Sequence, residues 1–122
     1  MVKAVLINGG ISKTSRLTGI HEYIEAYLIK AQIQTKSIFV HELPAQDLIT
    51  ANFASKEIKE ANQLVAEADI VIFLTPIFKA SFTGILKTFL DLMPQNALEN
   101  KKVVTLGLGG SLAHLLALEY SL

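Results

Sequence analysis

The sequence predicts an α/β fold in which helices cover both faces of a parallel sheet. Short apolar runs alternate along the chain with segments whose apolar residues recur at steps of three and four, giving a strand-helix order that repeats four times. The apolar runs are continuous, which is typical of parallel strands buried on both faces. Such alternation favours right-handed crossovers and a doubly wound arrangement. The chain has 122 residues, 51% of them hydrophobic. This length and composition predict one domain spanning residues 1–122.

The first half of the chain supplies the first two predicted strands. The apolar run from Ala4 to Ile7 predicts a buried strand that ends in a glycine turn. Apolar residues at helical spacing predict a helix from Ser15 to Ala31. A second strand is predicted from Lys36 to Val40, and the stretch from Glu42 to Phe53 is interpreted as a loop.

The second half repeats the pattern. Ser55 is a suitable N-cap for a helix that continues to Ala68. The remaining predicted elements are a strand from Ile70 to Leu74 broken by Thr75-Pro76, a helix from Phe82 to Met93, a strand from Val103 to Leu108, and a last helix starting near Ser111.

The alternation stops inside the helix that follows the fourth strand. A doubly wound sheet of order 2-1-3-4-5 requires one more strand and helix. We therefore predict strand order 2-1-3-4 in a C-terminally truncated domain that lacks the fifth strand and last helix. The fourth strand, Val103 to Leu108, would then be an exposed apolar edge open to pairing with another chain.

Composition excludes several classes of protein. Eleven Lys and Arg residues balance eleven Asp and Glu residues, which argues against binding to nucleic acid or to an anionic membrane surface. The N-terminal apolar run is too short to span a membrane and has no cleavage site after it. The chain has no cysteine, which fits a cytoplasmic protein and excludes thiol catalysis and thiolate metal sites. Any redox chemistry must therefore come from a cofactor.

The loop after the first strand has the composition of an anion site. In open α/β sheets ligands bind beyond the carboxyl ends of the strands. The segment from Gly9 to Arg16 combines two glycines, hydroxyl groups that include Ser12 and Ser15, and two cations directly before a helix N-terminus. Free N–H groups and the helix dipole favour a phosphate there, and Arg16, the only arginine of the chain, could bind it in a fork. The alternative is an ordinary polar turn in which Arg16 pairs with a carboxylate.

Two well-known phosphate motifs do not match this loop. The dinucleotide fingerprint G-x-G-x-x-G fails because no glycine follows Gly10 until Gly19. The loop of nucleoside triphosphatases, G-x-x-x-x-G-K-[ST], fails because Ser12 stands where its second glycine would precede Lys13. A nucleoside triphosphate enzyme is therefore not expected.

The loops after the third and fourth strands could hold a flat ring. Thr75 to Gly84 has a rigid proline bend and two phenylalanines, and the alternative is that Phe78 and Phe82 complete the core. Gly109-Gly110-Ser111 would let the backbone approach a ligand, although paired glycines also make ordinary turns. His21 and His41 are interpreted as surface or capping groups. His114 lies near the third loop, but no carboxylate or second histidine at ligand spacing makes it a metal site.

At these loops the sequence resembles the NADPH-dependent FMN reductases, in particular the flavin reductases of bacterial alkanesulfonate two-component monooxygenases. The family motif G-S-P-x-x-x-S-R aligns with Gly9 to Arg16, and T-P-x-Y-K aligns with Thr75 to Lys79. The motif S-G-x-L-K aligns with Thr83 to Lys87, and G-G-x-x-A-H-L-L-A-x-x-Y aligns with Gly109 to Tyr120. The resemblance spans nearly the whole chain.

The resemblance implies a flavodoxin-like fold and an NADPH- or NADH-dependent reduction of FMN by hydride transfer, which needs no catalytic protein nucleophile. It implies that Ser15 and Arg16 hold the FMN phosphate, within a loop that also contains Gly9 and Ser12. The residues that it places around the isoalloxazine ring are Thr75, Pro76, Ile77 and Phe78 on one side and Gly109, Gly110 and Ser111 on the other.

The resemblance also implies a homotetramer and a partner monooxygenase that receives reduced flavin. Tyr120 stands where such reductases carry a tyrosine associated with flavin that is released as a substrate. Two departures concern the binding geometry. Gly10 and Ile11 replace the usual Ser-Pro, and Phe78 replaces a tyrosine, which removes a hydroxyl beside the ring.

Three other functions share this pattern. A quinone or azo-dye reductase with resident FMN would use the same loops and differ in its electron acceptor. A flavodoxin-like electron carrier would have no NAD(P)H activity, and the neutral net charge disfavours its acidic docking surface. A scaffold that binds no flavin is the remaining alternative.

Overall fold

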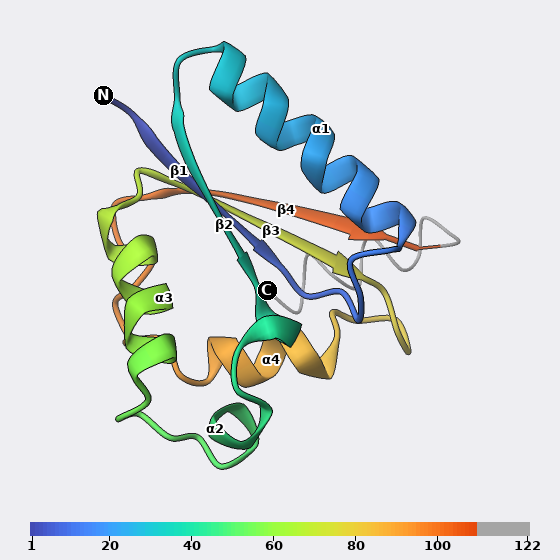
Figure 1. Ribbon diagram of the computed structural model, residues 1–122, viewed down its shortest axis with the longest axis vertical. Coiled ribbons are helices and arrows are strands. Elements are labelled where there is room, and N and C mark those ends of the chain that lie inside the picture. Colours follow the sequence, from blue (N-terminus) through green and yellow to red (C-terminus); the bar gives the residue numbers. More distant parts are fainter. Residues whose placement is uncertain (110–122) are drawn as a thin grey trace.

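The computed structural model describes residues 1–109 and shows a four-stranded parallel sheet of order β2-β1-β3-β4 (Figure 1). The strands are β1 (Lys3–Asn8), β2 (Gln34–Phe39), β3 (Ile70–Pro76) and β4 (Lys102–Leu108). This confirms the predicted strand order, with β4 at one edge of the described sheet. β1 and β3 lie in the centre, so their carboxyl ends and the loops that follow them are neighbours.

Helices cover both faces of the sheet, as predicted. They are α1 (Arg16–Lys30), α2 (Ala45–Ile49), α3 (Lys56–Glu67) and α4 (Gly84–Leu90), with a short 3-10 helix at Val40–Glu42. α1 lies on one face, and α3 and α4 lie on the other (Figure 1). Alternate residues of β1 divide accordingly, because Ala4 and Leu6 pack toward α1 whereas Val5 and Ile7 pack toward α3 and α4.

Local sequence explains where these helices begin. Ser15, Ser55 and Thr83 are the N-caps of α1, α3 and α4, and each side chain accepts a hydrogen bond from a backbone N–H in the first turn. The Ser55 cap confirms the predicted start of α3. In α3 the apolar positions Ile58, Ala61 and Val65 face the sheet and are buried.

The prediction of a loop from Glu42 to Phe53 was wrong, because α2 occupies Ala45–Ile49. Pro44 precedes it with φ of −58°, which suits the start of a helix, and Leu48 anchors the segment in the core. Thr75 and Pro76 do not break β3 either. They are its last residues, where a proline removes little of the hydrogen-bond ladder.

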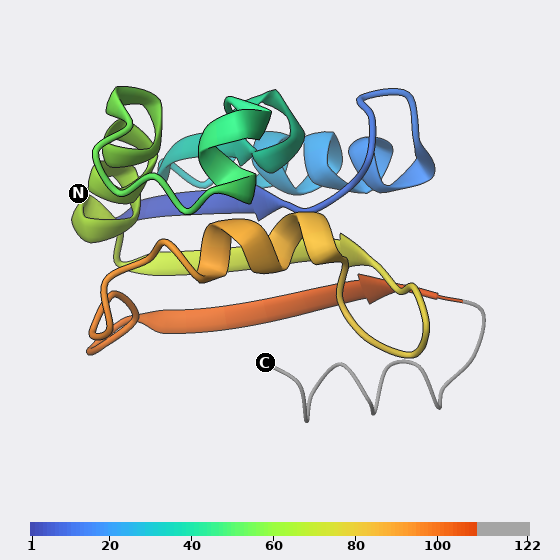
Figure 2. The same ribbon diagram turned by 90° about the horizontal axis from the view of Figure 1, so that it is seen from below.

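The edge strand β4 is less covered than the central strands. Val103, Val104 and Leu106 are exposed hydrophobic residues, with Val104 43% exposed. Val104 and Leu106 pair with Ile72 and Leu74 of β3, so they lie on the sheet face that α1 covers. Figure 2 shows β4 at the side of the sheet away from β1 and β2. This agrees with the predicted apolar edge.

Candidate functional site

The candidate site lies at the carboxyl ends of β1, β3 and β4, and its first part is the loop between β1 and α1. Ser15 caps α1, and its Oγ accepts a hydrogen bond from the Thr18 N–H at 3.4 Å. Arg16 is the first residue of α1, is exposed, and makes no ion pair with any residue that the structure describes. The alternative in which Arg16 is occupied by a carboxylate is therefore disfavoured within residues 1–109. A free guanidinium beside a helix N-terminus is suited to an anion.

Gly9 joins this loop to the rest of the site. Its N–H donates to the Leu74 carbonyl at 2.7 Å, and its carbonyl accepts from the Thr83 hydroxyl at 2.7 Å. A Cβ on Gly9 would lie 2.7 Å from the Leu86 Cβ. Glycine is therefore required here by a close approach to α4 and not by an unusual backbone angle.

The middle of the first loop is held by side chains. The Thr18 hydroxyl donates to the Ser12 carbonyl at 3.3 Å, and the Ser12 Oγ lies 3.3 Å from the Thr14 hydroxyl. Lys13 pairs with Glu42 at 2.9 Å, and its ammonium lies 5.0 Å from the centre of the Phe39 ring. Lys13 is therefore engaged away from Arg16, which leaves Arg16 as the cation of this loop without an ionic partner among the described residues.

The second loop follows β3, whose second-last residue, Thr75, is fully buried. Its hydroxyl donates to the Pro76 carbonyl at 2.7 Å and accepts from the Thr83 N–H at 3.1 Å. The next residue, Ile77, is buried, and its N–H donates to the carbonyl of Leu108 at the end of β4 at 3.1 Å. Thr75 and Ile77 thus fix the loop between the first and third loops, and their side chains face the interior.

A tight turn at the tip of this loop presents Phe78. The backbone groups of Phe78 and Ser81 exchange two hydrogen bonds of 3.0 and 3.2 Å. Lys79 and Ala80 between them both have positive φ, 53° and 60°, as in a type I′ turn. Phe78 is 49% exposed, whereas Phe82 packs against the core. Completion of the core therefore explains Phe82 but not Phe78.

The third loop is described only in part. Gly109 is exposed and directly follows β4. Gly110, Ser111 and Tyr120 lie outside the described residues. The Leu108 carbonyl that receives the Ile77 N–H places the start of this loop beside the second loop.

Sequence reasoning missed a buried polar chain beneath the first loop. His21 was predicted to be a surface or capping group, but its ring is 1% exposed. Its Nδ1 lies 3.1 Å from the Asn8 amide nitrogen and its Nε2 lies 2.8 Å from the Ser37 hydroxyl. Burial lowers the pKa of His21 and outweighs the carboxylates of Glu25 and Glu22, which raise it. The sequence did contain a signal for this burial. His21 is four residues after Leu17 and seven before Leu28, which places it on the buried face of the helix with these two leucines.

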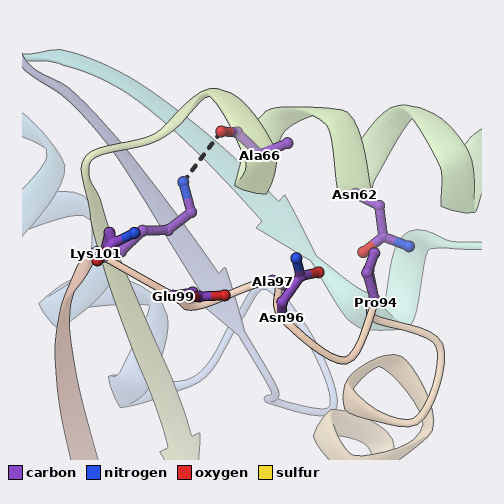
Figure 3. A pocket seen from close by; sticks show the side chains of 8 residues that line it. Asn62, Ala66, Pro94, Asn96, Ala97, Glu99 and Lys101 are labelled. Carbon is purple, nitrogen blue, oxygen red and sulfur yellow. Dashed lines mark hydrogen bonds between the residues drawn. The ribbon is translucent and has the colours of Figure 1, made fainter.

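A polar cavity of about 420 Å³ lies at the opposite end of the sheet (Figure 3). It is lined by α3 and by the segment before β4, including Asn62 and Lys101. The Lys101 ammonium donates to the carbonyls of Ala66 and Ala68 at the end of α3. These contacts hold α3 to the start of β4, and the cavity is far from the strand ends that carry the candidate site.

Known proteins match this chain over nearly its whole length. A family model described as NADPH-dependent FMN reductase matches residues 2–122. The FMN reductase (NADPH) of Pseudomonas putida KT2440 is 42% identical over 118 residues, which cover 97% of this chain and 60% of that protein. The FMN reductase (NADPH) of Escherichia coli K12 is 34% identical over 121 residues, which cover 99% of this chain and 63% of that protein.

A solved structure supports the same assignment. The crystal structure of an NADH:FMN oxidoreductase in its apo form superposes with a TM-score of 0.90 at 39% identity, covering 98% of this chain and 65% of that one. The chain thus spans less than two thirds of the length of these relatives. No described helix has the length and apolar character needed to cross a membrane. The flavodoxin-like fold is confirmed, and the chain belongs to the NADPH-dependent FMN reductase family.

Proposed function

We propose that residues 1–122 form a flavin-binding domain of an NAD(P)H-dependent FMN reductase. NADPH or NADH gives a hydride to FMN, and with one proton from solvent the products are reduced FMN and NAD(P)⁺. FMN supplies the electron-accepting ring in this reaction. The chain would bind FMN and orient its ring for hydride transfer from the nicotinamide.

The observation that carries this proposal is the state of Arg16. Its guanidinium is exposed, has no ionic partner among residues 1–109, and stands at the N-terminus of a 15-residue helix. The FMN phosphate would accept hydrogen bonds from Arg16, from the Ser15 hydroxyl and from N–H groups of the first helical turn. Ser12 and Gly9 shape the same loop, and the hydrogen bonds of Gly9 keep it in place.

The proposal assigns the isoalloxazine ring to the second and third loops. Thr75 and Ile77 are buried and set the path of the backbone, and Phe78 offers an exposed aromatic surface beyond the strand ends. We propose that Thr75, Pro76, Ile77 and Phe78 line one side of the ring and that Gly109, Gly110 and Ser111 line the other. The hydrogen bond from Ile77 to Leu108 holds the described parts of these loops together.

We further propose that the protein releases FMN as a substrate and that Tyr120 is associated with this release. Reduced FMN would then pass to a partner monooxygenase. A homotetramer acting in the cytoplasm is part of the same proposal. The support is the family membership of the chain and its cysteine-free sequence.

Oxidation of NADPH and NADH by the purified chain, followed at 340 nm with and without added FMN, tests the function. The expected result is oxidation that depends on FMN and saturates with it. A purified protein that keeps stoichiometric FMN through dialysis would contradict the released-substrate proposal. Activity with quinone alone would indicate a quinone reductase, and flavin binding without NAD(P)H oxidation would indicate an electron carrier.

A further inference from the structure

A continuous chain of hydrogen bonds runs from the first loop into the protein interior. The Gly10 N–H donates to the Asn8 Oδ1 at 2.8 Å, and the Asn8 Nδ2 lies 3.1 Å from the His21 Nδ1. The His21 Nε2 lies 2.8 Å from the Ser37 Oγ, which donates to the Glu25 carboxylate at 2.6 Å. The chain thereby connects the loop after β1 with α1 and β2.

The donors and acceptors of this chain have only one consistent assignment. A backbone N–H can only donate, so Gly10 requires the oxygen of the Asn8 amide, and the amide nitrogen must then donate to the His21 Nδ1. An ionised carboxylate can only accept, so the Ser37 hydroxyl donates to Glu25 and must accept from the His21 Nε2. The Asn8 end therefore requires an Nδ1 without hydrogen, and the Ser37 end requires a hydrogen on Nε2. Together they define a neutral His21 with its hydrogen on Nε2.

We propose that His21 is a positioning residue for flavin binding, because it fixes the amide of Asn8 and thereby the backbone of the phosphate loop at Gly10. The inference rests on the proposed function, in which this loop holds the FMN phosphate. His21 acts through Asn8 and touches no ligand itself. Gly10 is a suitable target, because its N–H is buried and committed to Asn8.

Protonation of His21 would break this arrangement. An imidazolium carries hydrogen on both nitrogens, so its Nδ1 would face the Asn8 NH₂ group donor to donor. The amide would have to turn, which would remove its oxygen from the Gly10 N–H. Acid should therefore loosen the phosphate loop while leaving Arg16 in place.

Burial and the neighbouring charges together determine the pH at which His21 takes up a proton. The charged and titratable groups near the ring are Glu22 and Glu25 on α1, and Lys13, His41 and Glu42 around Phe39, which stacks on His21 at 4.6 Å. Burial nevertheless lowers the pKa of His21 below 6.5, so the ring is neutral at pH 7.

The lowered pKa of His21 also affects folding. Because the unfolded chain takes up its proton first, the free energy of unfolding falls as pH drops through 6.5 and levels off below the lowered native pKa.

The test is the dissociation constant of FMN and of riboflavin between pH 5 and 8, measured by flavin fluorescence quenching. The FMN phosphate itself titrates near pH 6, so His21→Asn serves as the control. This variant keeps an acceptor oxygen near the Nδ1 position but cannot be protonated. On acidification the preference for FMN over riboflavin should fall in both proteins. We expect the fall to be about five- to tenfold larger in the wild type than in His21→Asn, because that factor corresponds to the loss of one hydrogen bond.

A second variant should remove the effect. Asp at position 8 accepts from both the Gly10 N–H and a protonated His21, so Asn8→Asp should lose the additional acid decline. Nitrogen-15 spectra of the imidazole give the pH at which His21 takes up its proton, and the titrations extend below that pH. Identical profiles for wild type, His21→Asn and Asn8→Asp across that pH would overturn the positioning role while leaving the proposed function intact. Absence of any preference for FMN over riboflavin in the wild type at pH 8 would instead overturn the phosphate site, and the positioning role with it.

The tautomer can be measured without any variant. Nitrogen-15 chemical shifts of the imidazole should show hydrogen on Nε2 and none on Nδ1 of His21 at pH 7.5. The opposite tautomer, or an imidazolium at that pH, would overturn the proposal even if His21→Asn fails to fold.

Discussion

The first and second loops of the candidate site reach their shapes in different ways. The first loop, 9–15, is held by side-chain contacts and by a glycine with no room for a Cβ, and it leaves Arg16 free. The second loop, 77–83, turns on Lys79 and Ala80 at positive φ and leaves Phe78 exposed. The two loops therefore expose different chemistry. The first loop commits its neutral groups to one another and leaves the cation of Arg16 exposed, whereas the second loop leaves the aromatic surface of Phe78 exposed.

Gly9→Ala should give the largest effect on stability, because the added Cβ would lie 2.7 Å from the Leu86 Cβ. We expect a loss of about 3 kcal/mol in the free energy of unfolding, measured with urea. Gly19→Ala is the matched control. Apart from its chain neighbours and the backbone of its own helix, no atom lies within 4 Å of a Cβ at this position, and a mid-helix alanine should add about 1 kcal/mol to the free energy of unfolding. Equal effects of the two variants would contradict the close-approach argument.

Arg16→Ala should weaken FMN binding by about 1.5–3 kcal/mol through loss of a charge-assisted phosphate contact. Riboflavin, which lacks the phosphate, should bind nearly as before, and titration calorimetry measures both ligands. Equal losses for the two flavins would exclude the phosphate role of Arg16. Lys13→Ala is the control, because Lys13 is engaged with Glu42 and should change the two affinities little.

Phe78→Ala should weaken FMN and riboflavin by the same amount, about 1 kcal/mol, because it removes a stacking surface and no charge. The measurement is the same titration as for Arg16→Ala. The two variants together separate the phosphate end from the ring end of the site. A loss confined to FMN would show that Phe78 does not contact the ring.

Ala80→Gly should have the smallest effect and a stabilising one. Alanine at a φ of 60° is strained, and glycine removes the strain, although it also adds freedom to the unfolded chain. We expect a net gain of about 0.5 kcal/mol in urea unfolding. Ala26→Gly on the exposed side of α1 is the control and should lower the free energy of unfolding by about 1 kcal/mol. A loss of stability at both positions would contradict the claim that Ala80 is strained.

The fold was largely predictable because buried parallel strands are continuous apolar runs. β1 and β3 were located within one or two residues from such runs, and the Ser55 cap marked α3. α2 was missed because it is five residues long and too short to show a helical period. The first residues of β2, Gln34 and Thr35, were missed because an edge strand can begin with polar residues whose backbone alone pairs with β1.

The site was predictable in its loops but not in its interior. Polar, glycine-rich segments at strand ends identified the first loop, and the structure brings the first and second loops together as expected. Asn8 and His21 were missed because their contact joins residues on different elements. No single-sequence pattern shows that a histidine will meet an asparagine across a strand and a helix. The roles predicted for the site residues stay predictions.

The Thr83 hydroxyl donates to the Gly9 carbonyl and accepts from the Leu86 N–H, while the Thr83 N–H is bound to Thr75. Because one residue holds both loops and the first turn of α4, none of the three can open without disturbing the others. Their amide protons should therefore exchange with solvent in one cooperative event. A ligand that binds at the phosphate end would then slow exchange at the ring end as well, even if it contacts nothing there.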